Sequence, residues 1–513
     1  MKRILLGMIF SFVLLFPLLS DTLLGSYKDD YLDALVLLGK TSRDYLHIRT
    51  FSTNSYTFIG EDNKTDFNKF NIIPVLPNFH MSYNHYDPNE GNDGAAWQGK
   101  GFNIWGYAGV MGSWKGFTTT LVPQFWFAQN LSFPLMTADI SHDSEYAYFT
   151  GNIDLPQQFG DEAIFKIDWG ESELRYSWKR LTIGFGTQSL WIGPARYNPV
   201  LFSNNAAGIP KLDIGLLPLD LTGIGSLEFR MWWGQLKESE YFDDDSSNDL
   251  RYANGFHLVF SPELISGFTI GVHRIIIADW NSVDYKNPFT IINPVMNQDF
   301  GYDLSDQRAS ITFNWLFSEV GFEVYGEWGK NDYSARWEDI LLSPEHSQAF
   351  TLGGRQAFSP FINDNQFFIL EGEVSDFINT RDYEIGLGMS QTGFYTHHLI
   401  TQGYTNDGQL IGPQVGPGAD VQTLKLNYFW PEGKVAGFFQ RIHVNKDYLY
   451  GDPARLPGDI LKAYIKFKAG FEWYYKFNSF TLGGKVYYLT IKNYNWIEDN
   501  DINSFYLGFS IEM

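Results

Sequence analysis

The feature that most constrains this chain is a two-residue alternation of apolar and polar side chains, repeated in many short segments after residue 102. In the last segment, 504–513, every second residue from Phe505 to Met513 is apolar, and the residues between them are Tyr506, Gly508, Ser510 and Glu512. An extended strand turns alternate side chains to opposite faces. Repeated half-apolar strands predict an all-β fold, a transmembrane antiparallel β-barrel whose last strand pairs with the first. Further examples lie at 227–233, 311–317, 320–328, 383–389 and 471–488.

The polar face of these segments argues against a water-soluble β-sandwich. It is rich in Gly, Ser, Thr and Tyr, and long charged side chains are occasional. Short links at 318–319, 431–433 and 478–479 are typical of periplasmic turns, and the length suggests about eighteen strands. The longer polar insertions are expected to be external loops; they lie at 238–254, 281–306, 331–365 and 397–420.

The N-terminus carries a predicted leader and one predicted helix. Lys2 and Arg3 precede an apolar run to about residue 19, so we interpret residues 1–20 as a signal peptide. Residues 21–60 are expected to form a short helical, periplasmic segment, with an amphipathic helix over 27–40 that caps or plugs the barrel. Residues 61–513 then form the barrel, its plug and its loops. We therefore expect the bacterial outer membrane as the location.

Charge and composition exclude several classes of function. The net charge of −22 excludes a nucleic-acid binder, which needs Lys and Arg against phosphates. The acidic run 243–249 lacks the Gly and Glu of a calcium loop, and adjacent His397 and His398 would face opposite sides of a strand, so we expect no metal site. The pairs at 323/327 and 371/373 have a spacing that glycosidases tolerate, but an acidic lumen shows the same spacing. We expect no catalysis and no cofactor.

A group of lysines recurs on the polar face of the C-terminal strands. Two interpretations stay open: the lysines balance luminal glutamates, or they form a basic stripe that attracts an acidic polymer. The residues are Lys425, Lys462, Lys466, Lys468, Lys476 and Lys485.

Several blocks between the strands combine Trp and Tyr with Asn, Gln, Asp and Arg. Aromatic faces pack on sugar rings, and amide, carboxylate and guanidinium groups bond to hydroxyls. The same residues could instead satisfy one another inside a plug. The candidates for polysaccharide binding or for the plug are Asp93, Trp97, Gln98, Gln129, Asn130, Trp191, Arg196, Asn198, Asn204, Asn205, His397 and Tyr404.

These blocks resemble the capsule-assembly family of outer-membrane barrels, the Wzi family. In order, they read NDGAAWQG at 92–99, AQN at 128–130, DLPQQFGD at 154–161 and WIGPARYNPVLFSNNAAGIP at 191–210. The resemblance implies an eighteen-stranded, plugged barrel with a helical periplasmic portion and a lectin-like role in holding group 1-type capsular polysaccharide. Two features depart from the family: the region before the barrel is short, and the last residue is Met513, not an aromatic one.

The sequence thus predicts a non-enzymatic outer-membrane protein that binds and anchors capsular or other extracellular polysaccharide. The alternatives are a channel for oligosaccharides and a surface glycan hydrolase. The expected partners are the polysaccharide, outer-membrane lipids and lipopolysaccharide, and the barrel-assembly machinery during insertion. We expect a monomer and no nucleic acid.

Overall fold

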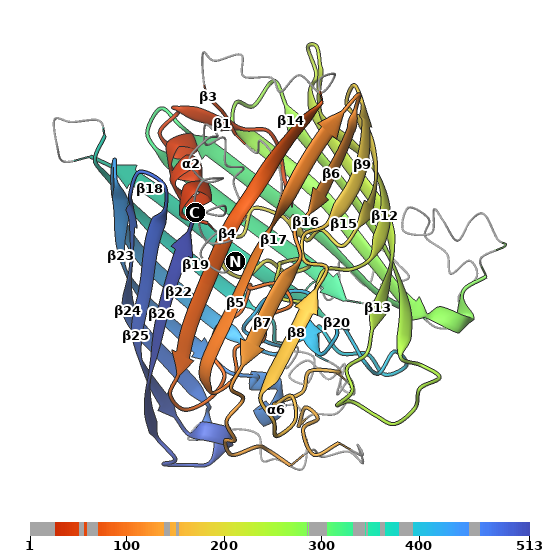
Figure 1. Cartoon of the computed structure of the whole chain (residues 1–513), viewed down its shortest axis with the longest axis vertical. Coiled ribbons are helices and arrows are strands. Elements are labelled where there is room, and N and C mark those ends of the chain that lie inside the picture. Colours follow the sequence, from red (N-terminus) through yellow and green to blue (C-terminus); the bar gives the residue numbers. More distant parts are fainter. Residues whose placement is uncertain are drawn as a thin grey trace, which may run out of the picture.

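Antiparallel strands close into a barrel, and the last strand of the chain is hydrogen-bonded to the first (Figure 1). β26 (Ile502–Glu512) pairs with β4 (Asn71–Asn84), as the sequence predicted. The structure is a computed structural model that describes residues 26–50, 56–58, 70–137, 144–149, 153–284, 286, 305–331, 344, 347–359, 365–378, 393–450 and 462–513. The other wall strands are β5 (Gly101–Trp114), β6 (Phe117–Leu121), β7 (Gln124–Ala128), β8 (Ile164–Asp168), β9 (Glu173–Trp178), β10 (Leu181–Gly186), β12 (Lys211–Leu221), β13 (Gly225–Lys237), β14 (Leu250–Pro262), β15 (Phe268–Asp279), β16 (Ser305–Phe317), β17 (Phe322–Asn331), β18 (Gln348–Phe358), β19 (Phe367–Asp376), β22 (Asp420–Trp430), β23 (Gly433–His443), β24 (Ile465–Lys476) and β25 (Thr481–Lys492).

Two positions in the wall are each built from two short segments. β6 and β7 both pair with β5, and β9 and β8 pair with β6 and β7 in turn. The break between β6 and β7 falls at Val122 and Pro123, because proline has no N–H to give to the ladder. In the described part of the chain, the twenty paired segments therefore make eighteen wall strands, which confirms the predicted number.

Alternate side chains of the wall turn outward and form an apolar surface. Ile311 is 44% exposed, Leu424 53%, Phe471 64% and Leu507 48%, whereas Glu472, next to Phe471, is buried in the lumen. A closed barrel satisfies its backbone groups internally, so its outer face can be apolar and contact lipid. The predicted transmembrane barrel is confirmed. None of the helices that the structure describes is long and apolar enough to cross a membrane.

The two rims of the barrel differ in their connections. Short turns join β12 to β13, β14 to β15, β16 to β17, β22 to β23 and β24 to β25 at the rim near α2 (Tyr27–Leu37), the upper rim in Figure 1. Long connections follow β4, β7, β10, β13 and β19 at the opposite rim. Short turns mark the periplasmic side of such barrels. The long-loop rim is therefore the external one.

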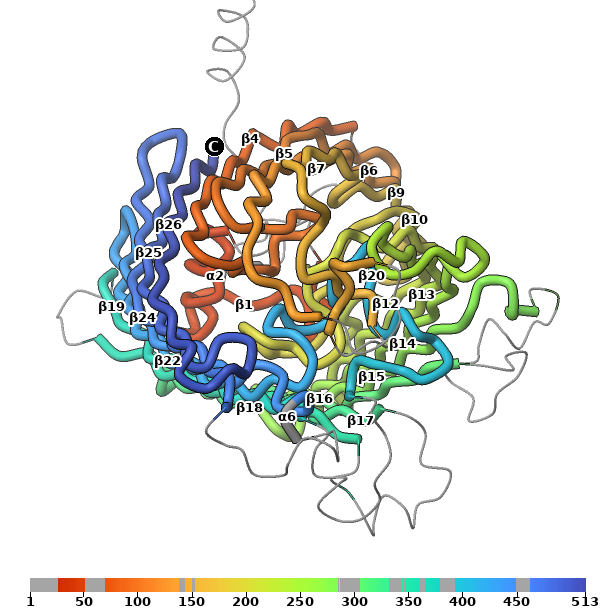
Figure 2. Tube along the Cα trace, turned by 90° about the horizontal axis from the view of Figure 1, so that it is seen from below, coloured from red at the N-terminus to blue at the C-terminus, as the bar shows by residue number. Residues whose placement is uncertain are grey.

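Long external connections turn back into the barrel and fill it (Figure 2). We call the segments 85–100, 187–210 and 393–419 the plug. Their apolar side chains, such as Leu201 and Tyr404, are fully buried against the luminal residues Trp232 and Ile275 of the wall. The predicted internal plug is therefore present. Within it are β11 (Leu190–Ile192), β20 (Thr405–Asn406) and β21 (Gln409–Leu410).

The N-terminal helix α2 lies inside the periplasmic mouth (Figure 2). Ser26 caps it by accepting the Asp29 N–H at 3.2 Å, and Gly39, with a φ of +67°, follows its end. Leu35 packs against Phe367 of the wall, so the helix lies inside the barrel and is not an outer cap. The chain then forms β1 (Thr41–Arg43), which pairs with β3 (Tyr56–Phe58), and β2 (Ile48–Thr50), which pairs with β11 of the plug.

Some predicted loops differ from the structure. The segment 397–420 is not an external loop: its apolar residues Ile400 and Leu410 draw it into the lumen, where both are buried. The loop predicted over 238–254 ends at Asp249, and Asn254 is buried in the wall strand β14. The leader 1–20 and the predicted strand 383–389 lie outside the described residues, as do most of 281–306 and 331–365.

Candidate functional site

Four aromatic side chains gather at the external end of the molecule. Trp97, Tyr146 and Tyr241 are half-buried, and Phe159 between them is buried. The ring centroids of Trp97 and Phe159 are 4.9 Å apart, those of Phe159 and Tyr241 5.7 Å, and those of Tyr146 and Tyr241 5.7 Å. We call these four residues the external aromatic cluster. The plug supplies Trp97, and the connections after β7 and β13 supply the others.

Polar groups border and support the external aromatic cluster. The Lys166 ammonium lies 5.9 Å from the Phe159 ring centroid and 3.6 Å from the Asp407 carboxylate. Beneath, Asn130 adopts a φ of +54° and its amide donates to the carbonyls of Phe159 and Gly160 at 3.0 and 2.8 Å. These bonds fix the loop that carries Phe159. Aromatic faces beside a few fixed polar groups are typical of a sugar-binding surface.

Asp93 and Gln98, predicted in the first block, lie deeper in the lumen. The Gln98 amide donates to Asp93 Oδ2 at 2.5 Å, and its carbonyl oxygen accepts from the Ser82 hydroxyl at 2.6 Å. Burial raises the pKa of Asp93 to about 7, although the hydrogen bond from Gln98 acts in the opposite direction. The contacts of Asp93 and Gln98 described above are with each other and with the wall residue Ser82, and they hold the plug in place.

Asn204 and Asn205 join the three segments of the plug. The Asn204 carbonyl accepts the Gly94 N–H at 2.7 Å. The Asn205 amide donates to the Leu410 carbonyl at 2.9 Å, and its Oδ1 accepts the Asn92 N–H at 3.2 Å. The backbone of Asn204 and the side-chain amide of Asn205 therefore hold the plug together, one of the two roles that the sequence left open.

The other predicted residues are also distributed through the plug. Trp191 is buried and donates to the Ala195 carbonyl at 2.9 Å, and the Asn198 N–H donates to a wall carboxylate. His397 accepts the Ile400 N–H at 3.0 Å. Tyr404 lies under the Arg308 guanidinium, and Gln129, which is exposed, accepts the Phe102 N–H at 3.0 Å. Of the twelve predicted residues, only Trp97 enters the external aromatic cluster, with Asn130 beneath it; contact with sugar stays a prediction for all twelve.

Luminal carboxylates of the wall hold the plug and the N-terminal segment by accepting their backbone N–H groups. Glu327 accepts from Val200 at 2.8 Å, and Glu373 accepts from Asn198 at 2.8 Å. Glu228 accepts from three successive residues, Leu46, His47 and Ile48, at 3.0, 3.0 and 3.2 Å. An anion that accepts several N–H groups satisfies backbone that would otherwise be buried without partners. The pairs at 323/327 and 371/373 are engaged in this way or in ion pairs.

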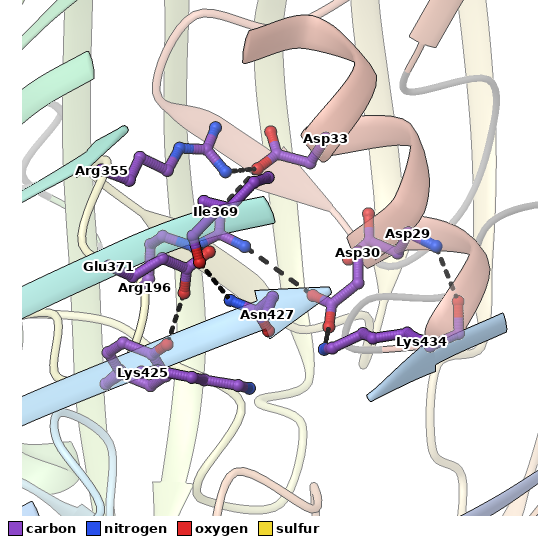
Figure 3. A network of polar contacts seen from close by, with 12 residues as sticks. Asp29, Asp30, Asp33, Arg196, Arg355, Ile369, Glu371, Lys425, Asn427 and Lys434 are labelled. Atoms are coloured by element: carbon purple, nitrogen blue, oxygen red, sulfur yellow. Dashed lines mark hydrogen bonds and ion pairs between the residues drawn. The ribbon is translucent and has the colours of Figure 1, made fainter. Parts of the chain in front are cut away.

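A network of buried ion pairs holds the helix in the periplasmic mouth (Figure 3). Asp33 of α2 contacts Arg43, Arg196 and Arg355 at 2.8, 2.5 and 2.7 Å. Burial alone would raise the pKa of Asp33, but the three guanidinium groups outweigh it and hold that pKa well below its usual range. We call Asp33 and these arginines the helix latch. Arg196, predicted as a sugar contact, is buried in it.

Neighbouring charges extend the network toward the C-terminal strands. Lys434 lies 2.7 Å from Asp30 of the helix and 2.7 Å from Glu472 of the wall, which also binds Lys425 at 2.5 Å. Asp29 pairs with Arg49. The N-terminal segment is therefore attached to the wall by charge on several sides.

The predicted lysine stripe is engaged with carboxylates. Lys466 lies 2.6 Å from Asp87, and Lys485 and Lys468 lie 2.6 and 3.6 Å from Glu90. With Lys425 on Glu472, four lysines of the stripe are paired, whereas Lys476 is exposed at the periplasmic end of β24. These contacts favour charge balance over a free basic stripe.

The sequence alone does not identify Tyr146, Tyr241, Lys166 and Asp407 as site residues. Single aromatic residues in polar connections carry no periodic pattern, and their convergence depends on how three connections fold together. One signal was available in the sequence: Tyr241 is an aromatic residue in a segment predicted as an external loop, and binding residues often lie on such loops. Among the described residues, no three His, Asp or Glu side chains are arranged to hold a metal.

The comparisons with known proteins agree with this architecture. The profile of the family described as "Capsule assembly protein Wzi" matches residues 136–476. Among curated proteins, none matches. The solved structure of Wzi from Escherichia coli, described as a carbohydrate-binding β-barrel involved in group 1 capsule assembly, is 13% identical, with a TM-score of 0.57 over 85% of this chain and 84% of that one.

Two other solved barrels are more distant. OccAB1 of Acinetobacter baumannii is 9% identical, with a TM-score of 0.42 over 88% of this chain and 98% of that one. OccK9 of Pseudomonas aeruginosa is 8% identical, with a TM-score of 0.40 over 85% and 96%. The profile match covers well over half of the sequence. This chain therefore belongs to the Wzi family of capsule assembly proteins.

Proposed function

We propose that this outer-membrane protein binds an extracellular polysaccharide and anchors it at the cell surface during capsule assembly. Membership of the family and the carbohydrate binding described for the Escherichia coli protein support the class of ligand. The observation that carries the proposal is the external aromatic cluster, which stands above a filled lumen. Trp97, Tyr146 and Tyr241 offer partly exposed rings to sugar C–H groups, and Lys166 and Asp407 offer hydrogen-bonding groups beside them.

The filled lumen weighs against the channel and hydrolase alternatives. Fully buried residues such as Leu201 and Tyr404 occupy the middle of the barrel, where a channel would need water. The carboxylate pairs predicted at 323/327 and 371/373 are buried, and Glu327 and Glu373 hold plug backbone, so a glycan has no route to either pair. We further propose that the protein works as a monomer within outer-membrane lipids and lipopolysaccharide, after insertion by the barrel-assembly machinery.

Binding of the refolded barrel to an array of bacterial polysaccharides tests the proposal. Wild type should bind at least one polysaccharide. The double variant Trp97→Ala/Tyr241→Ala should bind it about tenfold or more weakly, because central aromatic residues dominate such interfaces. Trp114→Ala, an exposed tryptophan at the end of β5 near the periplasmic rim, is the matched control and should bind as wild type does.

Equal binding by the double variant and the Trp114→Ala control would show that the external aromatic cluster is not the site. An array without any bound polysaccharide would contradict the function itself. Trp191 and Arg196 both lie in the plug, and Arg196 also belongs to the helix latch. The variants Trp191→Ala and Arg196→Ala separate loss of contact from loss of plug order, since they should alter proteolysis of the loops as well as binding.

A further inference from the structure

A polar cavity of about 290 Å³ lies in the lumen, away from the external aromatic cluster. Its wall is formed by β4, β5, β25 and β26 on one side and by plug segment 85–100 on the other. A second cavity of about 380 Å³ adjoins it at the periplasmic rim, beside α2 and the turn between β24 and β25. Ser26, Asn78 and Glu512 line both cavities, so the inner one is approached from the periplasmic side.

The lining of the inner cavity is rich in hydrogen-bond acceptors. Lys485 is the one lysine among the described lining residues, against the five carboxylates of Glu90, Asp93, Glu171, Glu472 and Glu512. Carboxylates accept hydrogen bonds and, when ionised, donate none, so the lining suits a ligand that brings several donors.

The charges of the cavity narrow the ligand further. Glu90 is compensated by Lys485 at 2.6 Å, and Glu472 by Lys425 at 2.5 Å. Asp93, Glu171 and Glu512 form no ion pair with a described residue, and Lys485 is already engaged with Glu90, so the described lining offers an anionic ligand no cation that is not already paired. Sugar hydroxyls, in contrast, donate to carboxylates and amide oxygens without bringing charge.

Aromatic rings complete the lining. Trp105, Tyr107, Tyr474 and Tyr506 all border the cavity. Aromatic rings beside hydrogen-bond acceptors are typical of sugar-binding sites, the chemistry also proposed for the external aromatic cluster. The volume is at the lower end for small-molecule pockets and suits one sugar ring.

We propose that this cavity is a second binding site, open toward the periplasm, for one uncharged sugar residue. It goes beyond the polysaccharide binding proposed for the external face and does not depend on it. The external aromatic cluster meets polymer outside the cell, whereas this cavity would hold a single residue or chain end on the periplasmic side of the plug.

Saturation-transfer difference NMR on the full-length barrel, refolded in detergent, tests the proposal. The probes are the methyl glycosides of glucose, galactose, mannose and N-acetylglucosamine, with glucuronic acid as the charged counterpart. At least one neutral sugar should bind with a dissociation constant of about a millimolar, as expected for so few atoms. Glucuronic acid should bind about tenfold or more weakly. Absence of neutral binding, or equal binding of glucuronic acid, would overturn the proposal.

Two substitutions test whether the sugar binds in the cavity. Ser510→Phe should fill it and Asn78→Leu should replace a polar side chain of its lining by an apolar one of similar size, so each should weaken binding about tenfold or more. Ser226→Phe on β13, outside the cavity lining, is the matched control. Unheated gel mobility verifies that each barrel is folded. A folded Ser510→Phe barrel that binds the neutral sugar as wild type does would refute the site. Loss of sugar binding together with unchanged binding of external polysaccharide would show that the two sites are distinct.

A single cysteine tests the periplasmic approach, since the chain contains none. Thr481→Cys lies in the adjoining cavity, and a bulky maleimide there should abolish sugar binding. Asp244→Cys, on the external loop, should be without effect when labelled. Binding that survives labelling at position 481 would contradict access from the periplasmic rim.

Discussion

Buried carboxylates at the two ends of the lumen show opposite electrostatic behaviour. At the periplasmic end, Asp33 is surrounded by arginines, and its pKa lies well below the usual range. In the external half, Asp154 accepts the N–H and hydroxyl of Ser239 at 2.7 and 2.5 Å, and burial raises its pKa to about 6. Glu238, bonded to Gln402 at 2.6 Å, is likewise raised by burial, to about 8.

The difference teaches how one residue type serves two purposes. With cationic partners, a buried carboxylate stays ionised and forms stabilising ion pairs. With amides and hydroxyls, it accepts hydrogen bonds, and burial drives it toward the neutral form. The helix latch is therefore stabilising above about pH 4 and weakens as pH falls toward the lowered pKa of Asp33. For Asp154 and Glu238 in the external half, whose pKa values are raised, the stabilising contribution is instead lost as pH rises.

The largest expected effect follows from removing the centre of the helix latch. Asp33→Ala leaves Arg43, Arg196 and Arg355 without their shared anion, which should destabilise docking of α2 by roughly 3–5 kcal/mol. We expect the barrel to remain closed while its plug loosens. In planar bilayers, the variant should show conductance steps where wild type is nearly silent.

Asp244→Ala, on the exposed loop after β13, is the control and should stay as silent as wild type. A silent Asp33→Ala barrel would show that the helix is held by apolar packing and that the ion pairs are incidental.

A smaller effect should appear in the pH dependence of Asp93, a buried acid that is hydrogen-bonded to an amide and has no ion-pair partner among the described residues. The folded pKa of Asp93, about 7, lies above the unfolded value of about 3.9, so its stabilising contribution is complete at low pH and is lost as pH rises from about 4 to about 7. Asp93→Asn resembles the neutral form. The difference in urea midpoint between wild type and Asp93→Asn should therefore change over this range, by at most about 1.4 kcal/mol of stability per pH unit. A constant difference from pH 4 to 8 would contradict the raised pKa.

The smallest effect is expected where charge is most exposed. The ion pair of Lys166 and Asp407 has side chains 45% and 33% exposed, and such pairs contribute about 0–1 kcal/mol. Lys166→Ala should weaken polysaccharide binding only a few-fold in the array. A loss as large as that of Trp97→Ala/Tyr241→Ala would mean that charge, and not ring stacking, governs recognition.

The wall was predictable from the sequence because side chains alternate between the two faces of a strand at every residue. Alternation in 320–328 places Glu323, Tyr325 and Glu327 in the lumen, and the structure confirms it. The last strand, 504–513, was expected to close the barrel, and it pairs with β4.

The plug and the external aromatic cluster follow no such rule. Arg196 sits in a block that reads as a sugar contact, yet it meets Asp33, more than a hundred residues away in sequence. Tyr146 and Tyr241 converge only because two long connections cross the same rim. Residue type predicted the chemistry of these segments, and only tertiary packing decided which side chains face the lumen and which face outward.

The most direct test of the account is the fate of polysaccharide on cells. A deletion strain should carry either wild type or Trp97→Ala/Tyr241→Ala at equal levels in the outer membrane, and cell-bound and released polysaccharide should then be measured. We expect wild type to retain polymer on cells and the double variant to release it into the medium as the deletion does. Retention by the double variant at the level of wild type would contradict the account.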